Sequence, residues 1–112
     1  MVDGNSDNVS SDTVALGGNI ELSGFRDIPS ASMSVLRKIV GTYARRFSEI
    51  CKQFEKLSLH MKKVNEGEHS EKYEVHASVL DKGSLLTASN TDRNLFFAVD
   101  TALKRVESEI LK

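Results

Sequence analysis

Lysine and arginine side chains recur at a fixed interval between residues 36 and 54. Lys38, Arg45 and Lys52 stand seven residues apart, and Arg37 and Arg46 flank them. Seven residues are about two turns of an α-helix, so a helix here aligns the three cations in one stripe. A rigid helix spaces its cations so that they can contact successive phosphates of a nucleic acid. Each cation that binds a phosphate releases counterions from the nucleic acid, and arginine can bind a phosphate through two hydrogen bonds. The spacing favours a nucleic-acid-binding face, and its alternative is the solvated side of an amphipathic helix.

The other reactive side chains favour no catalytic site. His60 and His76 fall on the polar face of two predicted strands, but metal sites usually need three or four ligands. Cys51 falls among apolar helix positions and is interpreted as a small core residue. The acidic residues form no convergent pair, and the sequence has no glycine-rich phosphate-binding motif. We therefore expect no enzyme, no metal, no other cofactor and no small-molecule substrate.

Composition and charge indicate one domain behind a polar tail. Of 112 residues, 39% are hydrophobic and 28% are charged, which suffices for a single packed core. The net charge is −1, but residues 1–23 hold Asp3, Asp7, Asp12 and Glu21 and no base, so all 15 bases follow them. We expect residues 1–18 to be a disordered N-terminal tail and residues 19–112 to be the domain. The chain has a single cysteine and so forms no internal disulfide, and it shows neither a basic leader nor a long apolar run. We therefore expect a cytoplasmic protein without membrane contact.

The segments that must position the cations follow from periodicity. Alternating Ile20 and Leu22 predict a strand over 19–25, and Pro29 predicts a turn before a helix capped by Ser30, Ser32 or Ser34. Apolar residues at spacings of three and four then predict a core-facing helix that reaches residue 54. These residues are Leu36, Ile39, Val40, Tyr43, Phe47, Ile50, Cys51 and Phe54.

The second half of the chain predicts a meander followed by a helix. Alternation of apolar and polar residues predicts strands over 56–62 and 73–79. The tight turn Asp81–Gly83 follows, and Leu86 and Ala88 after it mark the inner face of the fourth strand of the chain. Asn94 is a suitable N-cap for the last helix. The apolar stripe of that helix is Leu95, Val99, Ala102, Leu103, Val106 and Ile110, and Arg93, Phe97, Lys104 and Arg105 lie off it.

The resulting element order is β-α-β-β-β-α. A right-handed crossover makes the first two strands parallel, and the meander makes the others antiparallel. We therefore expect an α+β fold, in which a four-stranded mixed sheet carries both helices on one face, an architecture like that of double-stranded-RNA-binding domains. The other sheet face is expected to stay polar.

Four segments of the chain are similar to the segments of a known family. Residues 36–40, LRKIV, are similar to the LREYV-type opening of the first helix in that family. Residues 83–94 match its hairpin-to-helix segment without a gap, although Asn94 replaces the usual Asp. Residues 95–100 resemble the start of its second helix, with Phe97 in place of Ala, and residues 103–107 continue the likeness. Residues 19–112 thus resemble the ribosome hibernation-promoting factor family, also called the ribosome-associated inhibitor or sigma-54 modulation family, in its short form.

The resemblance implies a stress-response factor that silences translation. It would bind ribosomal RNA of the small subunit and block the channel for mRNA and tRNA, and we expect a monomer off the ribosome. The residues expected to contact RNA are Lys38, Arg45, Lys52, Arg37, Arg46, Arg93, Lys104 and Arg105. The alternative is a protein–protein interaction module that uses the open polar sheet face or an edge strand.

Overall fold

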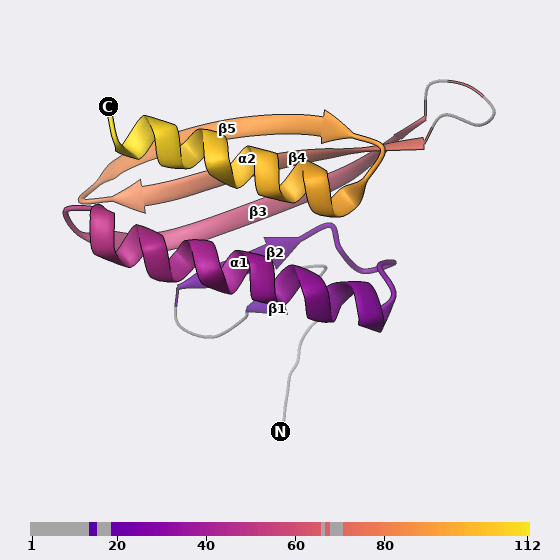
Figure 1. Cartoon of the computed structure of the whole chain (residues 1–112), viewed down its shortest axis with the longest axis horizontal. Coiled ribbons are helices and arrows are strands. Elements are labelled where there is room, and N and C mark those ends of the chain that lie inside the picture. Colours follow the sequence, from indigo (N-terminus) through magenta and orange to yellow (C-terminus); the bar gives the residue numbers. More distant parts are fainter. Residues whose placement is uncertain (1–13, 16–18, 66, 68–70) are drawn as a thin grey trace.

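The computed structural model describes residues 14–15, 19–65, 67 and 71–112 (Figure 1). It confirms the predicted α+β fold and its element order. The elements are β1 (Val14–Ala15), β2 (Ile20–Ser23), α1 (Ser30–Ile50), β3 (Phe54–Asn65), β4 (Glu71–Asp81), β5 (Ser84–Asp92) and α2 (Leu95–Ile110). Most of the predicted tail, residues 1–18, lies outside the described residues; Val14–Ala15 form β1, a short strand that the sequence did not predict.

The strands form one mixed sheet in the order β1-β2-β3-β4-β5. Strand β2 runs parallel to β3, because α1 carries the chain back across the sheet between them, and the other neighbours are antiparallel. Lys82 (φ 47°) and Gly83 (φ 82°) form the two-residue turn between β4 and β5. Two positive φ values are typical of a type I′ turn, whose twist matches the flanking strands, so the predicted hairpin is confirmed.

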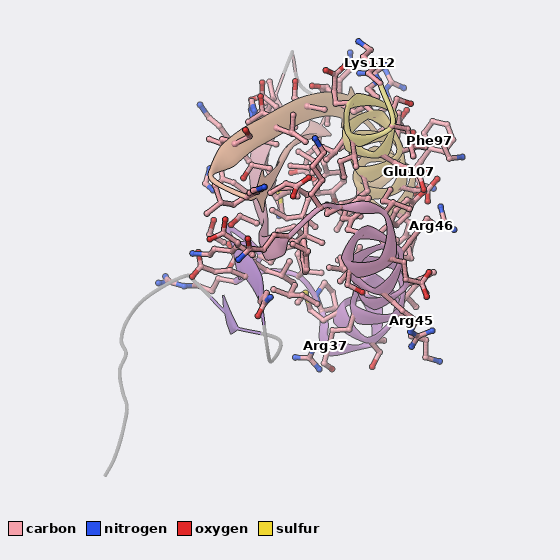
Figure 2. The ribbon with its side chains drawn as sticks, turned by 90° about the vertical axis from the view of Figure 1, so that its left-hand side faces the viewer. Arg37, Arg45, Arg46, Phe97, Glu107 and Lys112 are labelled. Carbon is pink, nitrogen blue, oxygen red and sulfur yellow. The ribbon has the colours of Figure 1, made fainter. Side chains whose placement is uncertain are left out.

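Both helices lie side by side on the same face of the sheet (Figures 1 and 2). The core between the two layers is apolar because strand alternation points Leu59 and Val75 at the buried sides of α1 and α2. Phe47 of α1 and Val99 and Leu103 of α2 are fully buried against them. Neither described helix is long and apolar enough to cross a membrane.

The loop between β2 and α1 supplies core residues that the sequence did not predict. Phe25 and Ile28 are buried in the main apolar cluster. Helix α1 begins at Ser30 with Pro29 as its N-cap, and no side chain caps it, so the predicted cap at Ser30, Ser32 or Ser34 is wrong. Pro29 already has a helix-compatible φ of −57°, and its carbonyl accepts the first helical bond from Met33 N (2.9 Å).

Helix α1 ends at Ile50, one turn before the predicted end. Cys51 is extended, and the Asp81 carboxylate accepts hydrogen bonds from the backbone amides of Gln53 (2.8 Å) and Lys52 (3.4 Å). These bonds hold the chain in a turn toward β3, whose first residue, Phe54, pairs with Asp81. Cys51 and Phe54 still pack against the core, which explains why the apolar spacing continued past the end of the helix.

Candidate nucleic-acid interface

The solvent side of α1 carries three cations from the predicted stripe and its flank. Arg37, Lys38 and Arg45 are exposed, and Val40 and Phe47 on the opposite side of the helix are buried. Within the described part of the chain, none of these three side chains has an ion pair or hydrogen bond. Figure 2 shows Arg45 projecting away from the sheet, and Arg37 at the edge of α1 that lies away from α2. Their charges are therefore available to an external anion.

Lys52 does not complete the stripe. It follows the C-cap Cys51, so the two-turn spacing that aligns Lys38 with Arg45 does not extend to it. The Lys52 side chain is exposed beside the turn into β3. Its predicted place on the helix face is wrong because Asp81 ends α1 before that turn forms.

Arg46 turns toward α2 and joins the two helices. Its guanidinium pairs with the Glu107 carboxylate (3.0 Å) and lies 5.0 Å from the centre of the Tyr43 ring. The Tyr43 hydroxyl donates to the Asp100 carboxylate (2.9 Å). Glu107 is only 17% exposed, so this pair is better shielded than most surface pairs. The Arg46 charge is thus partly neutralised within the helix layer.

Titration of the Tyr43 hydroxyl tests its burial and its hydrogen bond to Asp100. Burial, then the hydrogen bond to Asp100, raises the pKa of Tyr43 to about 12. An unfolded chain loses this proton near pH 10, so the stabilisation is complete below pH 10 and is lost as the pH rises to about 12. We expect the unfolding free energy to fall by roughly 2–3 kcal/mol across that range. The chain has two tyrosines, so in a Tyr73→Phe variant Tyr43 is the one that remains. Denaturant unfolding of this variant measures the fall in unfolding free energy, and phenolate absorbance measures the pKa of Tyr43.

A Tyr43→Phe variant is the control for that titration. It removes the phenol and retains the ring, so its stability should lack the Tyr43 component between pH 10 and 12. An equal decline in both variants would contradict the assigned burial of the hydroxyl.

The cations of α2 are engaged in local contacts. Lys104 pairs with Asp100 one turn earlier (3.6 Å), at a largely exposed position. Arg105 points to the sheet edge, where its guanidinium donates to the backbone carbonyl of Ser89 in β5 (2.7 Å). Arg93 is exposed just before the helix and has no ion-pair partner among the described residues. The eight predicted RNA contacts therefore do not form one surface.

Phe97 is 59% exposed on the outer side of the helix layer. Figure 2 shows it on the same side as Arg45 and Arg46. The start of α2 fixes its position, because Asn94 Oδ1 accepts a hydrogen bond from Phe97 N (3.0 Å), which confirms the predicted N-cap. We define the basic helix surface as Arg37, Lys38, Arg45, Arg46, Lys104 and Phe97.

The open face of the sheet is polar, as predicted, and is hollowed across β2, β3, β4 and β5. Small hydroxyl side chains and two histidines line this hollow. His60 and His76 lie directly opposite each other on β3 and β4, and Ser23 Oγ is 3.0 Å from His60 Nδ1. Among the described residues, no three His, Cys, Asp or Glu side chains are arranged to hold a metal ion.

Cys51 is half-buried at the end of α1. Burial, followed by the nearby Asp81 carboxylate, raises the pKa of its thiol to about 11. A nucleophilic cysteine needs the thiolate at neutral pH, and this environment disfavours it. This environment agrees with the interpretation of Cys51 as a small residue that packs against the core.

The sequence analysis missed the acidic partners that α2 supplies to Arg46 and Tyr43 of α1. Glu107 lies 61 positions from Arg46, and Asp100 lies 57 positions from Tyr43. No local pattern links such distant residues, and only the side-by-side packing of the helices brings them together.

A scan against protein-family models found no match, and a search of curated proteins found none either.

Proposed function

We propose that this protein binds ribosomal RNA of the small ribosomal subunit through the basic helix surface and blocks the channel used by mRNA and tRNA. The proposal places it in the cytoplasm of resting or stressed cells, as a factor that silences translation by occupying space. It combines the sequence resemblance of residues 19–112 to hibernation-promoting factors with the charge on α1.

The observation that carries the proposal is the set of unpaired cations on α1. Arg37, Lys38 and Arg45 are exposed, and within the described residues no acid neutralises them. The only acid of α1, Glu49, forms no ion pair with them. A rigid helix presents these charges without an entropic cost of ordering the backbone, and phosphates would replace counterions at each of them.

Arg46, Lys104 and Phe97 have supporting roles in this proposal. Arg46 and Lys104 have internal acidic partners, and a phosphate would have to compete with Glu107 and Asp100 for them. Phe97 offers an exposed ring on which an unpaired base can stack, a contact worth about 1–3 kcal/mol. The interface would therefore favour RNA that combines a phosphate backbone with an accessible base.

Salt dependence tests whether phosphate contacts carry the binding. If three cations contact phosphates, the logarithm of the association constant should fall linearly with the logarithm of salt concentration, with a slope of about −2 to −3. Fluorescence anisotropy of the labelled chain with purified small subunits measures that slope. A slope near zero would contradict the proposal.

A second candidate function is protein binding by the open sheet face. The hollow lined by Ser23, His60, His76, Ser78 and Thr87 favours it, because it is a concave surface formed by four strands. A contact there would depend weakly on salt, so the same anisotropy series distinguishes the two functions.

A further inference from the structure

Strand β5 forms a long, regular edge of the sheet. It spans nine residues, Ser84–Asp92, and pairs with β4 without a register shift, whereas β1, at the opposite edge of the described sheet, is described over Val14–Ala15. Proteins usually protect long edges with lysine, proline or a bulge, because unpaired backbone groups attract another strand. In β5 none of these is present, and its one charged residue, Asp92, stands at its end.

The hairpin geometry shows which backbone groups of β5 face outward. Asp81 and Ser84 close a two-residue turn, so alternate residues from Ser84 onward bond to β4. The backbone amides and carbonyls of Leu85, Thr87, Ser89 and Thr91 then point away from the sheet. Within the described chain, the one bond to these groups is the Arg105 guanidinium on the Ser89 carbonyl (2.7 Å).

We propose that β5 is a docking edge for a second copy of this chain, in an antiparallel β5–β5 pair centred on Ala88. If the whole of β5 pairs with β5 of the second copy, its middle residue, Ala88, lies at the twofold axis. Thr87 then lies opposite Ser89 of the second copy, and Leu85 lies opposite Thr91. Each outward-facing residue thus meets another outward-facing residue, which is the condition for a continuous antiparallel ladder.

The side chains of this pairing favour a second copy over an unrelated peptide. Leu85, which is 64% exposed, gains a neighbour, and the hydroxyls of Thr87 and Ser89 come within reach across the axis. Asp92 comes beside the Lys82 turn of the other copy, and the two Asp92 carboxylates lie at opposite ends. This proposed dimer differs from the monomer that the sequence analysis expects off the ribosome.

Arg105 weakens this dimer and adds a second test of the geometry. It occupies the outward-facing Ser89 carbonyl from the helix side, so a paired strand has to compete with the guanidinium for this acceptor. Removing the guanidinium leaves the acceptor free for the second copy. Arg105→Ala should therefore tighten the dimer several-fold.

Sedimentation equilibrium of the full chain without RNA tests the proposal. As concentration rises from about 10 μM to about 1 mM, where small interfaces assemble, the apparent mass should double from the monomer mass of 12.4 kDa. Thr87→Pro removes an outward amide that makes no bond to β4, so it should remain monomeric with an unchanged circular dichroism spectrum. Thr87→Lys, which adds a charge at the same place, is the second variant in case proline unfolds the strand.

Two results would overturn the docking edge. One is a wild-type chain that keeps the monomer mass over the whole concentration range. The other is dimerisation by folded Thr87→Lys as tight as that of the wild type, which would place the contact elsewhere. Because no RNA is present, neither result bears on the proposed ribosomal function.

Discussion

Replacing both Lys38 and Arg45 by glutamate should reduce affinity for small ribosomal subunits by at least ~100-fold, because two phosphate contacts become two repulsions. Both side chains are exposed on α1 and have no partner among the described residues, so their replacement breaks no internal contact. Anisotropy titration of the labelled variant at a fixed salt concentration measures the loss. The unfolding free energy should change by less than ~0.5 kcal/mol, as expected of surface substitutions.

The matched control is Lys62→Glu with Lys63→Glu. It makes the same change in net charge on β3, where both lysines are exposed near the strand's end and belong to neither helix. This control should keep most of the affinity for small subunits. Equal losses in the two double variants would mean that net charge, and not the basic helix surface, determines binding.

Gly24→Ala is expected to be the most damaging single substitution in the fold. Gly24 has φ +83°, a conformation that costs other residues about 1–2 kcal/mol, and an added Cβ would collide with the backbone carbonyl of Met61 in β3. A backbone carbonyl inside the sheet cannot move aside as a flexible side chain can. We expect a loss of ~3 kcal/mol or more of unfolding free energy, measured by denaturant titration.

Gly41→Ala, in contrast to Gly24→Ala, is expected to stabilise the fold. Gly41 lies within α1, and an added Cβ would meet no atom within 4 Å. Alanine has the higher helix propensity, so this variant should be more stable by about 0.5–1 kcal/mol. If Gly24→Ala were tolerated as well as Gly41→Ala, the close approach of the loop to β3 would be wrong.

The fold was predictable because its signals are local. Alternation at Leu57, Leu59 and Met61 and the Asp81–Gly83 turn identify strands and a hairpin without knowledge of distant residues. The Asn94 cap is local in the same way. The handedness of the crossover then leaves one arrangement for β2 and β3.

The features that sequence reasoning missed depend on distant residues. The end of α1 is set by Asp81, and apolar periodicity alone carried the predicted helix past it to Phe54. Arg46 and Arg105 look like free cations in the sequence, but Glu107 and the Ser89 carbonyl engage them. The buried Phe25 and Ile28 follow no period, since they belong to a loop.

Displacement of mRNA tests the central proposal most directly. Small subunits that carry a fluorescent mRNA fragment and a tRNA are titrated with the full chain, and the anisotropy of the mRNA is followed. We predict that mRNA is released as the chain binds, and that the Lys38→Glu/Arg45→Glu variant releases none. If mRNA stays bound while the wild-type chain sediments with the subunits, or if the chain never sediments with them, the proposed occlusion of the channel is contradicted.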